Sequence, residues 1–384
     1  MALQEEITKF RREIPLTRLG VFMNHAETSP MLRSVTQCMS SYLRENFQAL
    51  DTSRFIEQGC PRSLIAKLIG GTSTEICYTP NTSYGINVAA NSFPFKRGTN
   101  IVLWELEFPG NLYPWLNQRS KGIQIRWCHG PRLDVSKLEK LIDDRTVAVA
   151  VSHVNWINGF RPDLKRISEI VHKHGGLLFV DAAQSAGAIS IRVKQMGIDA
   201  LACAFYKWLL GPSGAGFLYV REDLIKKLAS PFVGFNGVKN TGPPFCSFNP
   251  KAIDLQDGAK RYAPGSMSPI PFLGAGLSLK MLLNVGINTI ERRILYLTDV
   301  IIEGLDSLGF DVISPREKRA RGGIVTFNVE DAAGISQMLL KKRIWVSPRR
   351  QKNIGGIRVS PHFYNTEAEI YKFLATLREI AKGR

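Results

Sequence analysis

The stretch ACAFYKWLLGPSGAGFLYV (202–220) sets Lys207 on a turn between two strand-like apolar runs. A little earlier, VDAAQSAGA (180–188) places an acidic residue, Asp181, at the end of another apolar run. Continuous apolar runs, rather than alternating ones, are typical of strands buried on both faces. Because ligands of α/β sheets bind beyond the carboxyl ends of the strands, we expect Asp181 and Lys207 at the binding rim of one sheet.

Similar apolar runs, separated by segments with helical patterns, lie on both sides of these stretches. Asp134 is a good N-cap for a helix over 135–142, and Asp163 for a helix over 164–174. Strands are expected, from short runs rich in β-branched residues, at 101–104, 147–151, 177–180, 200–204 and 217–220. This alternation of strands and helices predicts a mostly parallel sheet with helices on both faces.

The pattern changes after about residue 245. A long helical pattern over 271–308, broken near Gly286, leads into a smaller α+β part. Its expected elements are a strand at 323–329, a helix at 332–342, a strand at 356–360 and a final helix at 367–380. We therefore expect a large α/β domain over 14–265 and a small α+β domain made of 1–13 and 266–384.

Composition limits the class of protein and its surroundings. The chain has 384 residues, of which 44% are hydrophobic and 22% charged, and this balance excludes a disordered or collagen-like protein. The six cysteines show no CxxC pair and no zinc-finger spacing, so we expect neither a disulfide framework nor a metal site. The start of the chain has no apolar signal region, and no run of about 18 apolar residues occurs, so we expect a cytoplasmic protein without membrane spans.

The charge balance points to an anionic partner of some kind. Fifty Lys and Arg against 33 Asp and Glu give a formal net charge of +17. The basic residues stand in short scattered groups with no basic tail, so nucleic acid is not favoured. The sequence has no GxxxxGKS or GxxxxGKT loop and no GxGxxG after the first predicted strand, so the common nucleotide-binding folds lose support.

A lysine amine and a carboxylate at one rim are what pyridoxal phosphate requires. The amine forms a Schiff base with the cofactor, and the carboxylate keeps the pyridine nitrogen protonated so that the ring can draw in electrons. A solvated lysine beside a capping aspartate would give the same spacing. The spacing of Asp181 and Lys207 alone therefore leaves both interpretations open.

The segment 175–220 resembles the fold-type I, class V aminotransferase family of pyridoxal phosphate enzymes, which includes cysteine desulfurases, selenocysteine lyases, isopenicillin N epimerase and kynureninase. The likeness extends from about residue 20 to about residue 377 and includes five motifs in the family's order. It implies a large domain with a mostly parallel seven-stranded sheet and a small α+β C-terminal domain. By this resemblance Lys207 forms the Schiff base, Asp181 bonds the pyridine nitrogen and Gln184 donates to the cofactor's phenolic oxygen.

Two further segments resemble the family's phosphate-binding parts. In YTPNTSYGIN (78–87), Thr82 and Ser83 offer hydroxyls and backbone amides where a helix begins, and a helix N-terminus favours an anion. An N-cap without a ligand has the same geometry. In RYAPGSMS (261–268), Ser266 is similar to a position that reaches the phosphate bound by the other subunit of family dimers. The resemblance thus implies a homodimer with active sites at its interface.

Two segments resemble the surroundings of the cofactor ring. ELEFPGNLYPW (105–115) has Phe108 where desulfurases carry a histidine stacked on the ring. A phenyl ring can stack, but it cannot move a proton. In SHVNWINGFRPDL (152–164), His153 or Asn155 is expected to approach the cofactor, with a structural histidine as the alternative.

The C-terminal motif resembles the family's substrate-binding part. In IRVSPHFYNTEAEI (357–370), Arg358 is the expected partner of the substrate's α-carboxylate, with a surface ion pair as the alternative role. Cysteine desulfurases carry a nucleophilic cysteine on a loop shortly before this arginine, but RIWVSPRRQKNIGG (343–356) contains none. The nearest thiol in the sequence is Cys246, whose role is either catalytic or structural.

These departures leave general Schiff-base chemistry at the α-carbon of an amino acid. We expect a lyase that breaks a carbon–sulfur bond by β-elimination, or an epimerase. The alternatives are a cysteine desulfurase that uses Cys246 or an external thiol, an aminotransferase, and a catalytically silent scaffold protein. Arg349 and Arg350, expected on a loop that faces the site, suggest an acidic or phosphate-bearing substrate side chain, unless they are simply solvated.

Overall fold

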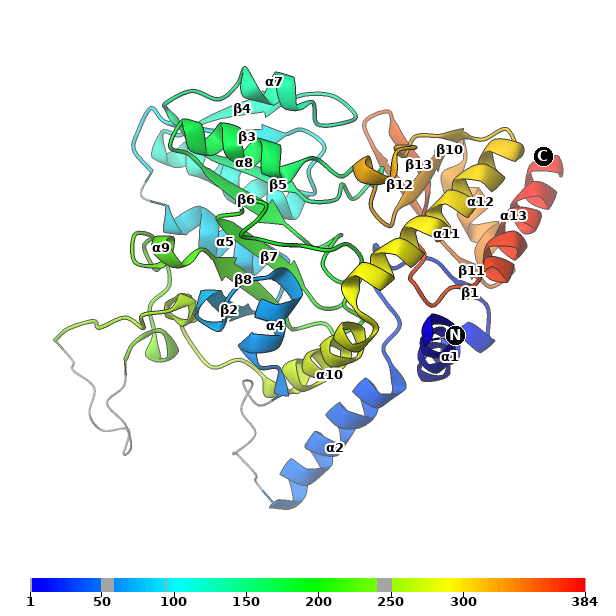
Figure 1. Ribbon diagram of the computed structural model, residues 1–384, viewed down its shortest axis with the longest axis horizontal. Coiled ribbons are helices and arrows are strands. Elements are labelled where there is room, and N and C mark those ends of the chain that lie inside the picture. The colour runs from blue at the N-terminus through cyan, green and yellow to red at the C-terminus, as the bar shows by residue number, and fades with distance from the viewer. Residues whose placement is uncertain (1, 50–58, 94, 240–250, 384) are drawn as a thin grey trace.

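The computed structural model describes residues 2–49, 59–93, 95–239 and 251–383. A seven-stranded sheet forms the centre of its larger part (Figure 1), in the order β2-β8-β7-β6-β5-β3-β4. Adjacent strands from β7 to β4 are parallel, and β8 alone runs against its neighbours. The strands are β2 (Ile76–Thr79), β3 (Asn100–Trp104), β4 (Gln124–Cys128), β5 (Thr146–Ser152), β6 (Leu177–Asp181), β7 (Ala200–Ala204) and β8 (Gly216–Val220). The predicted mostly parallel α/β sheet is confirmed.

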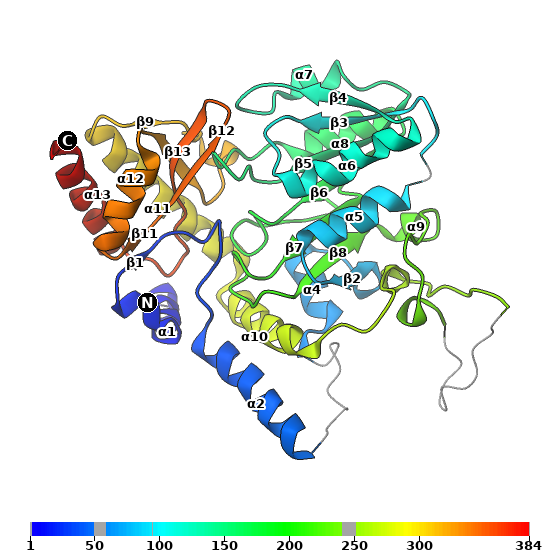
Figure 2. The ribbon, with the colours of Figure 1, turned by 180° about the vertical axis from the view of Figure 1, so that it is seen from behind.

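Burial on both faces explains why the central strands are apolar at every position. Along β5, Val149 packs in the cluster beneath α8 (Leu164–Lys173), whereas Ala148 packs in the cluster beneath α5 (Thr82–Ser92). Figure 1 shows α8 on the near side of the sheet, and Figure 2, seen from behind, shows α5 and α6 on the other side. Two edge strands, β2 and β4, were not predicted. β4 is partly exposed and carries polar residues, so it lacks a continuous apolar run.

Local capping fixes most helix ends near the predicted positions. The Asp163 side chain accepts a hydrogen bond from the Arg166 backbone at 3.0 Å and begins α8. α7 (Val135–Glu139) is shorter than the expected 135–142, because beyond Glu139 the backbone forms only i→i+3 turns. The other helices of this part of the chain are α1 (Ala2–Glu13), α2 (Arg33–Ala49), α4 (Arg62–Ile69), α6 (Tyr113–Leu116) and α9 (Glu222–Ile225).

The smaller C-terminal part is built on a four-stranded antiparallel sheet in the order β12-β13-β10-β9. The N-terminal strand β1 (Val21–Phe22) pairs in parallel with β11 (Ile344–Trp345), so the start of the chain joins this part. Its remaining elements are α10 (Pro269–Val285), α11 (Ile287–Ser307), β9 (Asp311–Val312), β10 (Val325–Asn328), α12 (Ala332–Lys341), β12 (Ser347–Gln351), β13 (Ile354–Val359) and α13 (Glu367–Lys382). The expected small α+β unit is therefore present.

The long helical pattern is two helices. Gly286, at φ 87°, separates α10 from α11, as the break in the sequence pattern predicted. Within the described ranges, no single helix is long and apolar enough to cross a membrane. α10 and α11 reach that length and composition only as a pair, and they are bent by 79°.

The hydrophobic clusters link the two parts of the chain. Val21 and Met23 pack in the C-terminal cluster, whereas Phe272 of α10 and Ile294 of α11 pack in the large cluster under the central sheet. We keep the division into 14–265 and 1–13 with 266–384 as a proposal. In this division, segments 21–23 and 272–294 hold the two units together.

Candidate active site

Five of the residues expected from sequence line a cavity of about 410 Å³ beside the carboxyl ends of the central strands: Thr82, Ser83, Phe108, Asp181 and Lys207. Asp181 is the last residue of β6, and Lys207 lies on the turn after β7. The N-terminus of α5 and the segment after β3 complete the walls. The lining residues are Pro80, Asn81, Thr82, Ser83, Phe108, Gly110, Asp181, Ala183, Tyr206, Lys207, Ser213 and Gly214.

Lys207 is half-buried and held by its backbone. The Ser29 hydroxyl donates to the Lys207 carbonyl oxygen at 2.5 Å, and the Leu210 backbone donates to the same oxygen at 3.0 Å. Burial lowers the pKa of the amine to about 8, with Asp181 opposing the shift and Arg358 adding to it. A lysine with this pKa carries a neutral, nucleophilic amine in a larger fraction of molecules than a solvated lysine does.

Asp181 shares its side of the sheet with Ser152, its partner in the β5–β6 register. Burial raises the pKa of the Asp181 carboxyl, while a hydrogen bond from the Ala183 backbone at 2.8 Å and the charge of Lys207 oppose this. A carboxylate held in this way is suited to bind a protonated ring nitrogen.

Sequence reasoning missed a second buried carboxyl, Glu107. It accepts hydrogen bonds from the Ser152 backbone at 2.6 Å and from Asn111 Nδ2 at 3.0 Å, and the Ser152 hydroxyl also donates to it. Burial raises its pKa to about 7, and Asp181 adds to the rise. The available signal was an acidic residue enclosed by Leu106 and Phe108, where a solvated carboxylate is not expected.

The N-terminus of α5 forms the polar end of the cavity. The Asn81 side chain caps the helix by accepting from the Tyr84 backbone at 2.8 Å. Thr82 and Ser83 line the cavity, and the buried Thr82 hydroxyl oxygen has no hydrogen-bond partner in the described part of the chain. The end of the helix dipole and an unpartnered hydroxyl together fit a phosphate group.

Phe108 lines the cavity beside Lys207, whereas Gln184, three residues after Asp181, lies outside the cavity lining. The Phe108 ring is 41% exposed and lies 5.6 Å from the Lys207 Nζ, so its face is available to a flat ligand. Gln184 is buried, and its Nε2 donates to the Ala26 carbonyl oxygen at 2.8 Å. Its amide has a second N–H that can serve a ligand.

Arg358 is 1% exposed and lies outside the cavity lining. Its Nη1 donates to the Trp156 carbonyl oxygen at 2.8 Å, whereas its buried Nε and Nη2 have no hydrogen-bond partner among the residues that the structure describes. Burial, together with the charge of Arg349, lowers the pKa of its guanidinium to about 9, and the charge of Glu27 opposes both effects. The Nε and Nη2 pair matches the two oxygens of a carboxylate.

The structure does not bring every expected residue to this cavity. His153, the residue after β5, borders a different cavity together with Leu164 and Lys165 of α8. Asn155 is fully buried outside the cavity lining, where its amide bonds the Leu106 carbonyl oxygen and the backbones of residues 157 and 158. Ser266 is exposed and lies outside the cavity lining. Cys246 lies outside the described residues.

The two arginines near the C-terminal motif lie on a strand, so the expected loop is corrected to β12. Arg349 points inward and pairs with Glu27 at 2.7 Å. Arg350 points outward and donates to the Val329 carbonyl oxygen at 3.1 Å. Strand alternation separates them, and only Arg349 affects the charge balance around Lys207.

A family model, aminotransferase class-V, matches residues 21–373. The chain belongs to this family. It is 29% identical to a probable cysteine desulfurase of Methanothermobacter thermautotrophicus, over 97% of each chain. It is also 28% identical to a probable cysteine desulfurase of Pyrococcus abyssi, over 100% of this chain and 99% of the other.

Solved structures show the same fold. The apo cysteine desulfurase of Thermococcus onnurineus NA1 superposes with a TM-score of 0.88 at 28% identity, covering 98% of each chain. The cystine C–S lyase C-DES, in complex with its product cysteine persulfide, has a TM-score of 0.84 at 22% identity, covering 93% of this chain and 97% of the other. The chain is thus a fold-type I pyridoxal phosphate-dependent enzyme that acts on an amino acid, as the resemblance implied.

Proposed function

We propose that the protein is a lyase that breaks the Cβ–S bond of a sulfur-containing amino acid by β-elimination. The observation that carries the proposal is one cavity lined by Lys207, whose amine has a lowered pKa, and, within range of its charge, the buried guanidinium of Arg358 with two nitrogens that have no partner among the described residues. The amine provides a base, and the guanidinium provides a fixed point for the α-carboxylate.

The lining residues fit pyridoxal phosphate, which supplies a carbonyl that condenses with amines and a ring that draws electrons from the α-carbon. Thr82 and Ser83, with the α5 N-terminus, would hold the phosphate, and Asp181 would bind the ring nitrogen. Phe108 would cover one ring face and exclude water. Gln184 would donate to the phenolic oxygen through its remaining amide N–H.

In the proposed reaction, Arg358 binds the α-carboxylate and so sets the direction of the α-carbon proton. The Lys207 amine takes this proton, the Cα–Cβ bond becomes a double bond, and sulfur leaves with the electron pair of the Cβ–S bond. Water then converts the released enamine to a keto acid and ammonia. In this proposal Lys207 carries the acid–base work, because Phe108 cannot transfer a proton.

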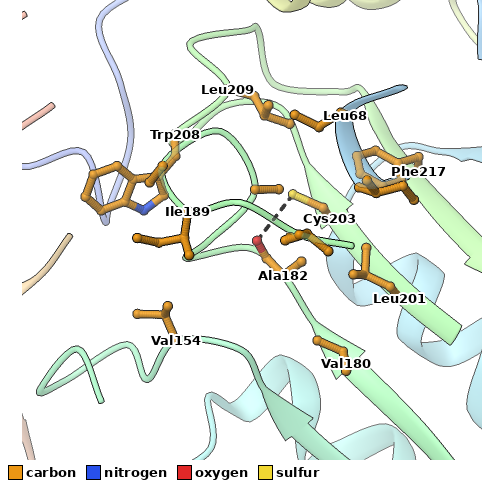
Figure 3. Packing of buried hydrophobic residues seen from close by; sticks show 14 of the residues in the cluster. Leu68, Val154, Val180, Ala182, Ile189, Leu201, Cys203, Trp208, Leu209 and Phe217 are labelled. Carbon is orange, nitrogen blue, oxygen red and sulfur yellow. Dashed lines mark hydrogen bonds between the residues drawn. The ribbon is translucent and has the colours of Figure 1, made fainter. Parts of the chain in front are cut away.

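The hairpin before Arg358 and the enclosed thiol of Cys203 support elimination over transfer of sulfur to the protein. The segment before Arg358 is the tight β12–β13 hairpin, closed by the Gln351 and Ile354 pair, and it carries no cysteine. Burial raises the pKa of Cys203, whose thiol points into the core toward the Ala182 carbonyl oxygen at 3.6 Å (Figure 3). A protonated, enclosed thiol is a poor nucleophile.

A second candidate function is cysteine desulfuration, favoured by the names of relatives that align along nearly the whole chain. It would require Cys246 or an external thiol to accept sulfur. We also propose a cytoplasmic homodimer in which Ser266 completes the phosphate site of the partner. The exposure of Ser266 leaves it available for such a contact.

Product analysis tests the proposal. The holoenzyme is incubated with L-cysteine, L-cystine and L-alanine separately, and pyruvate, alanine, sulfide and protein-bound persulfide are quantified. Elimination predicts pyruvate with sulfide or a small-molecule persulfide, from cysteine or cystine only. Alanine with protein-bound persulfide would identify a desulfurase, and a protein that neither binds the cofactor nor turns over would identify a scaffold. Cys246→Ser is the matched control, since elimination does not need this thiol.

A further inference from the structure

Trp208, the residue after Lys207, makes one polar side-chain contact. Its indole Nε1 donates to Gln184 Oε1 at 2.9 Å. The indole is fully buried, and Figure 3 shows it projecting from the turn in a different direction from Leu209, which points toward Leu68. The hydrogen bond therefore links the lysine-bearing turn to the segment that follows β6.

This contact decides which way the Gln184 amide is turned. An indole N–H can only donate, and the Ala26 carbonyl oxygen, which lies 2.8 Å from Gln184 Nε2, can only accept. A flipped amide would set N–H against N–H and oxygen against oxygen. The amide is thus held with its oxygen toward Trp208, and the N–H that remains unused lies on the nitrogen.

Trp208 is itself held in place from the C-terminal part. His362 Nε2 lies 3.0 Å from the Trp208 carbonyl oxygen, and the His362 Nδ1 accepts from the Phe363 backbone at 2.9 Å, so the ring is the Nε2–H tautomer. A Cβ at Gly323 would lie 2.5 Å from a carbon of the indole ring, so this neighbour must be glycine. The indole has little freedom to turn away from Gln184.

We propose that Trp208 is a positioning residue that fixes the orientation of the Gln184 amide and so keeps an N–H donor, rather than an oxygen, available to the cofactor's phenolic oxygen. The inference rests on the role given to Gln184 in the proposed function. Without the indole N–H, the Ala26 carbonyl oxygen alone holds the amide, so the flipped orientation, which opposes an oxygen with an oxygen, gains population.

The test compares Trp208→Phe with Trp104→Phe. Trp104 is also fully buried, and its indole donates to a carbonyl oxygen, that of Gly130, at 2.9 Å, away from the cavity lining. Two quantities are measured: the affinity of the apo-protein for pyridoxal phosphate, and the apparent pKa of the visible absorbance band of the bound cofactor. Trp208→Phe should weaken cofactor binding by roughly three- to tenfold, the effect of one hydrogen bond, and shift the pKa by about half a unit or more.

A double-mutant comparison separates positioning from a general loss of packing. In a Gln184→Met background, Trp208→Phe should cause no further change in either quantity. Wild-type values in Trp208→Phe, equal changes in Trp104→Phe, or a full additional effect in the Gln184→Met background would overturn the proposal. If the Phe variant does not fold, Trp208 is replaced by its benzothiophene analogue, which keeps the ring shape and lacks the N–H.

The two proposals fail in different ways. A wild-type protein that shows no cofactor band overturns the proposed function, and this inference falls with it. A normal wild-type band that is insensitive to Trp208→Phe overturns only the positioning role.

Discussion

The two ends of the cavity are built in opposite ways. At the cofactor end, Asp181 ends β6 and Lys207 lies on the turn after β7, and these two buried strands are parallel. At the substrate end, Arg358 belongs to an antiparallel hairpin whose charged residues, such as Arg349, are balanced by side chains from elsewhere. The positions of the side chains at the cofactor end thus depend on backbone and core packing, whereas charge pairing helps to set those at the substrate end.

Removal of Lys207 should have the largest effect. Lys207→Ala removes the amine that the proposal uses as base, so we expect kcat to fall by roughly 10³-fold or more. Because burial already disfavours the lysine's charge, the variant should remain folded, with a Tm close to that of the wild type. Turnover within tenfold of wild type would refute the assignment, and Lys165→Ala, an exposed lysine on α8, is the control.

Low pH should destabilise the protein where the Lys207 turn meets the C-terminal part, because a buried histidine, His362, joins them. Burial lowers the pKa of His362 to about 4, from about 6.5 in an unfolded chain. A depressed folded-state pKa contributes stability that is complete above pH ~6.5 and is lost as pH falls toward 4, on the order of 3 kcal/mol in all. The free energy of unfolding, measured between pH 7 and 4, should therefore fall less steeply in His362→Gln.

His25 acts in the same direction, since burial also lowers its pKa, and both of its nitrogens are occupied, by Ser360 and Tyr364. His129→Gln serves as the control, because its side chain is 70% exposed. An identical pH dependence in wild type and His362→Gln would show that the buried pair does not determine acid stability.

Removal of the Arg358 guanidinium should affect the substrate end alone. Arg358→Ala should raise KM for amino-acid substrates by a factor corresponding to roughly 1.5–3 kcal/mol, the range for a charged hydrogen bond. The cofactor's absorbance should not change. The control is Arg350→Ala, an outward-pointing arginine on the adjacent strand. Equal KM values in Arg358→Ala and wild type would remove the arginine from the substrate site.

The difference between the two ends also explains what the sequence could predict. The central strands carry continuous apolar runs because both faces are buried, and all five predicted ones are present. β12 carries a proline and two arginines, since it is an edge strand, and it was read as a loop. Asp181 and Lys207 could be placed at one rim because parallel strands end together.

The partners of individual side chains could not be predicted from the sequence. His153 comes one residue after Ser152, and a shift of one residue would turn its side chain to the other side of the sheet. No local sequence pattern fixes this register. The pairing of Glu107 with Ser152, and of Trp208 with Gln184, joins residues distant along the chain. Charge pairing could not be predicted either, because Glu27 and Arg349 lie at opposite ends of the chain.

The smallest expected effect concerns Arg349. Its charge is balanced by Glu27, whose other carboxylate oxygen accepts from Asn24 at 2.7 Å. The pair is partly exposed, so Arg349→Ala should cost about 0–1 kcal/mol of stability. The preference between amino acids with acidic and neutral side chains, measured as a ratio of kcat/KM, should barely change. Glu27→Gln sharpens the comparison, because it leaves the arginine uncompensated and should shift that ratio toward acidic substrates. A large loss of acidic-substrate preference in Arg349→Ala would instead show that this arginine binds the substrate side chain directly, and that the substrate end recognises two charges rather than one.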